Sequence, residues 1–160
     1  MQKIRVIRSG AQTGVDRGAL DAARSLDFPI CGWVPKGGLA EDYPSPPGLL
    51  TPYPELEETP TNDYYERTAW NVRDSDATLV LFPSELESSV GTEYTIEIAL
   101  DYKKPCLVLE KADAEQAIAW LETLGSNLDI NIAGPRLSNY PGIDNMTYDL
   151  IVQILEHYRI

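Results

Sequence analysis

The chain has 160 residues, of which 43% are hydrophobic and 24% are charged, and its formal net charge is −12 at pH 7. This length is typical of one domain, the composition excludes disordered and fibrous proteins, and the negative charge disfavours general binding of nucleic acids. A single histidine and only two cysteines cannot supply a zinc finger, a His-rich metal site or a disulfide framework.

Strand-like and helix-like patterns alternate along the chain. The alternating, β-branched residues Ile4–Arg8 predict a first strand, and the apolar spacing from Val15 to Leu26 predicts the helix that follows it. Further strands are predicted at Ile30–Val34, Ala77–Phe82, Cys106–Glu110 and Asp129–Ala133. Further helices are predicted at Tyr64–Asp74, Gly91–Tyr102, Ala114–Leu124 and Gly142–Tyr158.

The solidly apolar runs ATLVLF and CLVL are typical of strands that are buried on both faces of a parallel sheet. Strands of this kind alternating with helices predict an α/β fold. We expect residues 1–160 to form a single Rossmann-like three-layer domain with a mostly parallel sheet.

Residues 41–61 interrupt this alternation. The segment contains Pro44, Pro46, Pro47, Pro52, Pro54 and Pro60. Proline fixes φ and removes a backbone donor, so we expect an irregular excursion on the surface rather than a buried element. Its length favours a functional or partner-covering role.

No signal for membrane insertion or export is found in the sequence. No apolar run approaches the roughly 20 residues of a membrane helix. The start of the chain, MQKIRVIRSG, lacks the core of a signal peptide. We therefore expect a cytoplasmic protein with no membrane partner.

Glycine follows each of the strands that should end at the ligand-binding edge of the sheet. The segments concerned are Ser9–Arg17, Pro35–Asp42, Pro83–Thr92 and Gly134–Arg136, and three of them carry a cation: Arg17, Lys36 or Arg136. Ligands of open α/β sheets bind at the carboxyl ends of the strands, where helix N-termini offer N–H groups to anions. The sequence therefore predicts a pocket for a small phosphorylated ligand.

The first loop is the most distinctive of these segments. Gly10 and Gly14 bracket Gln12 and Thr13, whose side chains can form hydrogen bonds with a phosphate or a base. Asp16 either complements the helix dipole or contacts a ribose hydroxyl or a metal-bound water. The loop lacks the Gly-Lys-Ser/Thr ending of a P-loop and the G-x-G-x-x-G spacing of classical NAD-binding proteins.

Three further patterns have both a structural and a functional interpretation. Gly91 and Thr92 in the segment Ser88–Glu93 could bind phosphate, or Ser89 and Thr92 could simply cap the helix. Arg67, Asn71 and Asp74 share one face of their helix, which is either solvated or turned to the pocket. Lys36 forms a salt-linked turn with Glu41 and Asp42, or closes over an anion.

Five segments of the chain are distinctive: Ser9–Ala23 (SGAQTGVDRGALDAA), Gly32–Gly37 (GWVPKG), Ala40–Asp42 (AED), Arg67–Asp76 (RTAWNVRDSD) and Ala133–Arg136 (AGPR). These segments resemble the family known as putative molybdenum carriers, a circularly permuted branch of the SLOG superfamily, which is similar to lysine-decarboxylase-like Rossmann proteins. The resemblance implies a Rossmann-like fold that binds a nucleotide or a related phosphorylated ligand. The family name implies the molybdenum cofactor, a phosphate-bearing pterin that would bring the metal on its own dithiolene.

One motif of the better-known superfamily members is altered. They carry Pro-Gly-Gly-x-Gly-Thr-x-x-Glu, whereas here Ser88-Ser89-Val90 precedes Gly91-Thr92, and Thr95 stands at the position of the glutamate. This difference disfavours the cytokinin-activating phosphoribohydrolase chemistry of those relatives.

Two functions of different classes follow. The first is a binding or carrier protein without a protein-ligated metal. The residues expected to bind its ligand are Ser9, Gly10, Gln12, Thr13, Gly14, Asp16, Arg17, Lys36, Arg67, Asn71, Gly91, Thr92, Gly134 and Arg136. The second is a hydrolase or transferase that cleaves an N-glycosidic or phosphate bond of a nucleotide. Its acid/base groups or Mg²⁺ ligands would be drawn from Asp16, Glu41, Asp42, Asp74 and Glu93. A third hypothesis treats residues 41–61 as a partner surface of an assembly module, and a homo-oligomer is compatible with all three.

Overall fold

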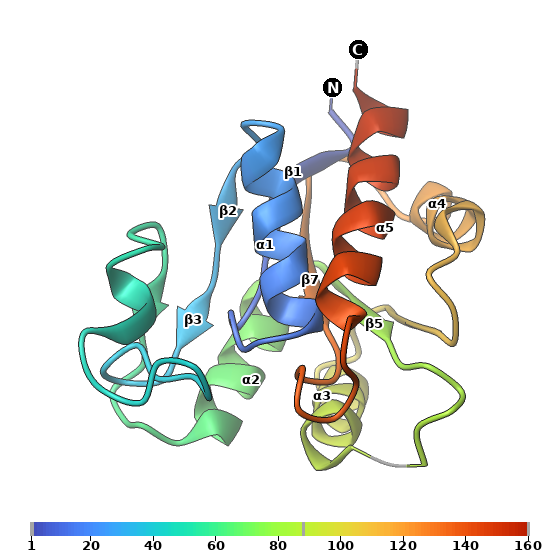
Figure 1. Cartoon of the computed structure of the whole chain (residues 1–160). Coiled ribbons are helices and arrows are strands. Elements are labelled where there is room, and N and C mark those ends of the chain that lie inside the picture. The colour runs from blue at the N-terminus through green and yellow to red at the C-terminus, as the bar shows by residue number, and fades with distance from the viewer. Residues whose placement is uncertain (1, 88, 160) are drawn as a thin grey trace.

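A parallel sheet forms the centre of the molecule (Figure 1). The structure is a computed structural model that describes residues 2–87 and 89–159. The sheet has the strand order β2-β1-β7-β5-β6, and each neighbouring pair runs parallel. Its strands are β1 (Ile4–Arg8), β2 (Ile30–Cys31), β5 (Ala77–Leu81), β6 (Cys106–Leu109) and β7 (Leu128–Ala133). The predicted Rossmann-like α/β fold with a mostly parallel sheet is confirmed.

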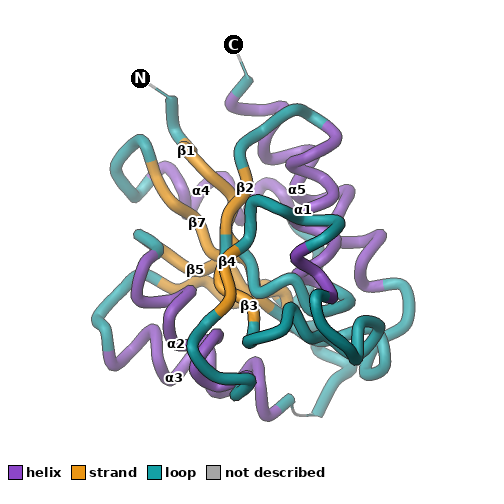
Figure 2. Tube along the Cα trace, turned by 90° about the vertical axis from the view of Figure 1, so that its left-hand side faces the viewer, coloured by secondary structure: helices purple, strands orange, loops and turns teal. Residues whose placement is uncertain are grey.

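Helices cover both faces of this sheet, which gives three layers (Figures 1 and 2). One face carries α1 (Val15–Ser25), α4 (Ala114–Glu122) and α5 (Ile143–Tyr158), and the other carries α2 (Tyr64–Asp74) and α3 (Val90–Asp101). Helices α1 and α5 pack closely because α1 is built from small residues. A Cβ atom on Gly18 would lie 2.3 Å from the carbonyl oxygen of Asp144 in α5, so only glycine fits at this crossing.

The burial of the strands follows their place in the sheet. All residues of β5 and all but the last of β7 are buried, as expected for strands covered on both faces. The expectation that Cys106–Glu110 is also a buried strand is wrong. The corresponding strand β6 lies at the edge of the sheet, and its Val108 is exposed. An apolar run predicts a strand but does not tell an edge position from a central one.

The strand predicted at Ile30–Val34 is divided in the structure. Gly32 separates β2 from β3 (Trp33–Val34), which pairs with β4 (Glu57–Glu58) in a second, two-stranded sheet. The chain passes very close to the first loop here, because a Cβ atom on Gly32 would lie 1.9 Å from the carbonyl oxygen of Ser9. Asn71 of α2 then holds β3 in place by accepting a hydrogen bond from the N–H of Trp33 (2.8 Å) and donating one to its carbonyl (3.0 Å).

The proline-rich segment is more than the surface excursion that the sequence predicts. It is irregular, with a short 3-10 helix (Gly48–Leu50) and strand β4. However, Leu49, Tyr53 and Leu56 are buried in the hydrophobic core. These apolar residues follow neither a helical nor a strand period, so the sequence pattern does not reveal that they anchor the segment.

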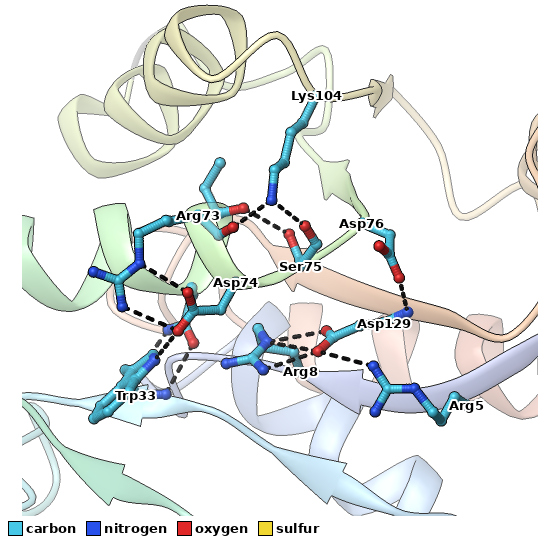
Figure 3. Close-up of polar contacts among 11 residues, drawn as sticks. Arg5, Arg8, Trp33, Arg73, Asp74, Ser75, Asp76, Lys104 and Asp129 are labelled. Carbon is cyan, nitrogen blue, oxygen red and sulfur yellow. Dashed lines mark hydrogen bonds and ion pairs between the residues drawn. The ribbon is translucent and has the colours of Figure 1, made fainter.

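A buried ion pair joins the strands β1 and β7 (Figure 3). Arg8 donates to both carboxylate oxygens of Asp129, from Nε to Oδ1 (3.0 Å) and from Nη2 to Oδ2 (2.8 Å). The N–H of Asp129 donates to Oδ2 of Asp76 (2.8 Å), which precedes β5. These contacts hold three neighbouring strands in register. None of the residues labelled in Figure 3 lines the cavity described below.

Within the described part of the chain, no helix is both long and apolar enough to cross a membrane.

Candidate functional site

A cavity of about 740 Å³ lies where the carboxyl ends of β1 and β7 meet α2 and the start of α3. Its volume is within the range of small-molecule sites in proteins. The predicted residues that line it are Gly10, Gln12, Asp16, Arg67, Asn71, Gly91, Thr92, Gly134 and Arg136. Polar lining residues that were not among the predicted ligand-binding residues are Thr68, Ser89, Thr95, Asn131, Ser138 and Asn139. Asn131 lies within strand β7, and no sequence motif distinguishes a polar residue there as a ligand contact.

Three predicted residues of the first loop shape it without lining the cavity. The hydroxyl of Ser9 accepts from the N–H of Ala11 (3.0 Å) and donates to the carbonyl of Asp16 (2.9 Å). The hydroxyl of Thr13 donates to Glu41 and accepts from the N–H of Leu137 (3.1 Å). Gly14 has a φ of 86°, and a Cβ atom there would lie 2.3 Å from the carbonyl oxygen of Pro135.

Two predicted ligand-binding cations, Arg17 and Lys36, also lie outside the cavity lining. Arg17 forms two hydrogen bonds with the carboxylate of Asp42 (2.8 and 2.9 Å), and its Nε donates to the carbonyl of Ala11 (3.0 Å). It therefore ties the proline-rich segment to the first loop. Lys36 is exposed and does not line the cavity. Its expected partner Asp42 pairs with Arg17 instead.

Most backbone N–H groups of the first loop have an acceptor within the protein. The recorded hydrogen bonds are Ala11 N–H to Ser9 Oγ, Gln12 N–H to Asp16 Oδ2, Thr13 N–H to Gln12 Oε1, Val15 N–H to the Pro135 carbonyl and Arg17 N–H to the Gln12 carbonyl. A phosphate would have to displace these internal acceptors in order to bind there. The loop is thus largely preformed, and among the described residues its N–H groups without an acceptor are those of Gly10, Gly14 and Asp16.

The N-terminus of α3 is open by comparison. Among the described residues, none accepts a hydrogen bond from the N–H of Val90 or Gly91, whereas the N–H of Glu93 already binds the carbonyl of Ser89 (2.8 Å). A Cβ atom on Gly91 would have no neighbour within 4 Å. N–H groups without an acceptor among the described residues, together with the helix dipole, make this end of the cavity favourable for an anion. Ser88, which the sequence patterns included here, lies outside the described residues.

Two buried residues of opposite charge also line the cavity. The guanidinium of Arg67 donates to the carbonyls of Gly10 (2.9 Å) and Tyr64 (3.3 Å). The carboxylate of Asp16 accepts from the N–H of Gln12, at 3.4 Å. Burial raises the pKa of Asp16 to about 6, although the nearby Arg67 and the Gln12 N–H lower it. Burial likewise lowers the pKa of Arg67, which Asp16 opposes.

Gln12 presents an unpaired donor to the same cavity. Its Oε1 accepts from the N–H groups of Thr13 (3.1 Å) and Glu41 (2.9 Å), which fixes the orientation of the amide because both partners are donors. The Nε2 atom is buried and has no hydrogen-bond partner among the described residues. Leaving a buried donor unpaired costs about 1–3 kcal/mol, so such an atom is typical of a site that a ligand completes.

Glu41 contacts Ser138 and Arg136, two residues that line the cavity, without lining it itself. It accepts from the hydroxyls of Thr13 and Ser138, the latter at 2.9 Å, and its Oε2 lies 3.7 Å from Nη1 of Arg136. Partial burial raises the pKa of Glu41, but the hydrogen bonds from Thr13 and Ser138 outweigh it, so that the pKa is lower than usual. The contact joins the proline-rich segment to the loop between β7 and α5.

Of the carboxylates considered as acids, bases or Mg²⁺ ligands, Asp16 lines the cavity. Asp74 instead accepts from Arg73 and from the indole N–H of Trp33 (Figure 3), and Glu93 is exposed on α3. In the part of the chain that the structure describes, no group of three or more His, Cys, Asp and Glu side chains is placed to hold a metal ion.

The comparisons with known proteins agree with this architecture. Residues 7–155 match the model of the circularly permutated YpsA SLOG family. A crystal structure of a protein described as "Putative molybdenum carrier protein", from Syntrophus aciditrophicus SB, is 41% identical to this chain. The match covers 96% of each chain with a TM-score of 0.84. A search of curated proteins finds no match.

Proposed function

Since this chain belongs to the circularly permutated YpsA SLOG family, we propose that it binds a small ligand composed of a heterocycle and a phosphate in the cavity at the carboxyl edge of its sheet. The observation that carries the proposal is the pairing of two features in one cavity. The start of α3 offers backbone N–H groups without acceptors among the described residues, and Gln12 offers a buried amide donor without a partner. Both favour a ligand that accepts hydrogen bonds.

The phosphate belongs at the start of α3. An anion there would accept from the N–H groups of Val90 and Gly91 and gain from the positive end of a helix of 12 residues. Arg136, which is partly exposed, lines the same cavity, and its positive charge makes the cavity as a whole more favourable for an anion. A position directly beside Asp16 is unfavourable for phosphate because a buried carboxylate would repel it.

Following the name of its solved relative, we propose that the ligand is a phosphate-bearing pterin of the kind found in the molybdenum cofactor. The cavity volume of about 740 Å³ accommodates such a molecule. The molybdenum would be cargo carried on the pterin's own sulfur atoms, which are the soft ligands that this metal favours. A nucleotide has the same two parts, a ring and a phosphate, and is the alternative ligand.

The test uses a matched pair of substitutions at Gly91. The side chain of Gly91→Asp or Gly91→Asn would extend into open space at the cavity, and the two differ only in charge. Isothermal titration with a pterin phosphate and with nucleoside monophosphates should show binding to the wild type. Gly91→Asp should weaken binding at least about tenfold by repulsion of the phosphate, and Gly91→Asn should change it by less than about threefold. An acidic residue in the first turn stabilises a helix, so a loss of affinity in Gly91→Asp cannot be assigned to unfolding when its melting temperature is unchanged or raised. Absence of binding of every phosphorylated ligand, or equal effects of the two substitutions, would contradict the proposal.

A second candidate function is supported by Asp16. A carboxyl group with a pKa of about 6 inside a ligand cavity is suited to transfer protons near neutral pH. The protein would then cleave a glycosidic or phosphate bond of its ligand instead of carrying it. Product analysis after incubation with nucleotides separates the two functions, since an enzyme releases base, sugar or phosphate and loses this activity in Asp16→Asn, whereas a carrier returns the ligand intact.

A further inference from the structure

Asp16 and Arg67 present an unusual arrangement of charge. Both side chains are buried, with 8% and 8% of their surface exposed, and both line the cavity. Among the described residues, Asp16 and Arg67 do not form an ion pair with each other within 4.0 Å. Buried charges are normally paired, because removing them from water is costly. Two opposite charges that face one cavity without touching indicate that a ligand group lies between them.

The chemistry of that group is restricted by the protein atoms around it. Asp16 in its charged form can only accept hydrogen bonds, whereas Arg67 and Nε2 of Gln12 can only donate them. A phosphate has only acceptors and would be repelled by Asp16, and an amine has only donors and would be repelled by Arg67. A neutral edge that carries N–H groups beside a carbonyl oxygen satisfies all three residues.

We infer that Asp16, Gln12 and Arg67 recognise the 2-amino-4-oxopyrimidine edge that pterin and guanine share. This inference rests on the proposed function, and it adds the ring class and the direction in which the ligand lies. The carboxylate of Asp16 accepts from the ring N–H and the exocyclic amino group, as carboxylates accept from pairs of parallel N–H donors. Gln12 and Arg67 donate to the carbonyl oxygen. The ring lies against α1 and α2, and the phosphate points to α3.

The site is rigid enough to discriminate between rings. The amide of Gln12 is held by two backbone N–H groups, and the guanidinium of Arg67 is held by the carbonyls of Gly10 and Tyr64. Adenine presents the opposite pattern, with a ring acceptor where guanine has N–H and an amino group where guanine has a carbonyl. It would turn a lone pair towards Asp16 and leave buried donors unpaired, and such mismatches reject an analogue by a factor of roughly 100 or more.

The affinities of the wild type for a set of monophosphates test the inference. We expect GMP and a pterin phosphate to bind, IMP to bind about tenfold more weakly because it lacks the amino group, and AMP to bind at least about 100-fold more weakly than GMP. Equal affinities for GMP and AMP would overturn the inference and would indicate that Asp16 and Arg67 bind ribose hydroxyls. The proposed function would stand in that case, because phosphorylated ligands still bind. The proposed function is contradicted by a different result, namely that none of these nucleotides, the pterin phosphate or ribose 5-phosphate binds.

The substitution Asp16→Asn provides a second test, the order of the affinities for GMP and XMP, which would not change if Asp16 had only a structural role. An asparagine can accept from the ring N–H and donate to an oxygen at position 2, which xanthine carries in place of the amino group of guanine. The substitution should therefore weaken the binding of GMP and strengthen the binding of XMP, each by a factor of at least about 10, so that the order of the two affinities is reversed. Asp42→Asn, which removes a carboxylate that pairs with Arg17 outside the cavity lining, is the matched control and should preserve the order. A uniform loss of affinity for both nucleotides in Asp16→Asn would overturn the inference.

Discussion

Removing the charge of Asp16 should stabilise the protein. In the folded state burial holds the pKa of this carboxyl at about 6, against an ordinary value of 3.8, and this is the net result after the attraction of Arg67 and the Gln12 N–H. A group whose folded pKa is raised binds its proton more strongly in the folded state, so its contribution to stability falls as pH rises from the unfolded pKa through the folded one. Above pH 6 the shift from 3.8 to about 6 costs about 3 kcal/mol, since one pKa unit is worth about 1.4 kcal/mol.

The substitution Asp16→Asn removes this cost and keeps the shape of the side chain. Burying an amide in place of the acid offsets about 1 kcal/mol of the gain. At pH 8 we therefore expect the free energy of unfolding of Asp16→Asn, measured by urea denaturation, to exceed that of the wild type by about 2 kcal/mol. The advantage should be smaller by about 1 kcal/mol at pH 5, where the wild-type carboxyl is mostly protonated.

The control for this experiment is Asp42→Asn, which breaks an ion pair of a partly exposed carboxylate with Arg17. The pKa of Asp42 is lowered by its hydrogen bonds from Arg17, so this substitution should destabilise the protein, by no more than about 1 kcal/mol. A wild type that is more stable than Asp16→Asn at pH 8, or a difference between them that does not change with pH, would refute the reasoning. A ligand that binds Asp16 stabilises the complex, and this gain offsets the cost of the buried charge in the free protein.

Two further predictions concern the fold. Gly18→Ala should lower the melting temperature by several degrees, a loss of about 2 kcal/mol or more, because the added Cβ would lie 2.3 Å from the Asp144 carbonyl and push α1 away from α5; an unchanged melting temperature would show that the two helices pack less closely than described. Asp129→Ala should cost about 3–5 kcal/mol in urea denaturation, because it leaves the largely buried guanidinium of Arg8 without its carboxylate. The double variant with Arg8→Met should recover part of this loss, and a cost of the single substitution below about 1 kcal/mol would contradict the prediction.

The parts of the fold that follow a period could be predicted from the sequence. The apolar spacing of α1 and α5 and the solid apolar run of β5 predict these elements nearly to their ends. The division of the strand at Gly32 could not be predicted, because it depends on the close passage of the loop after β1. The burial of Leu49 and Tyr53 within the proline-rich segment is likewise set by tertiary packing, which has no local pattern.

The convergence of the glycine-containing segments at one cavity could be predicted for a topological reason, since the carboxyl ends of parallel strands meet at one edge. Gly10, Gln12, Gly91 and Gly134 come together as expected. The role of each residue depends on its partners and could not be predicted. Arg17 is the clearest example, because a cation in the first turn of α1 was expected at the ligand and instead pairs with Asp42.

The central claim is that a phosphorylated ring binds across the cavity, with its phosphate at α3 and its ring at α1. A crystal structure of the protein with GMP bound tests it most directly. The account predicts the phosphate beside the N–H groups of Val90 and Gly91, and the pyrimidine edge of the base between Asp16 and Arg67. Density for the nucleotide outside this cavity, or inside it with the phosphate beside Asp16, would contradict the account.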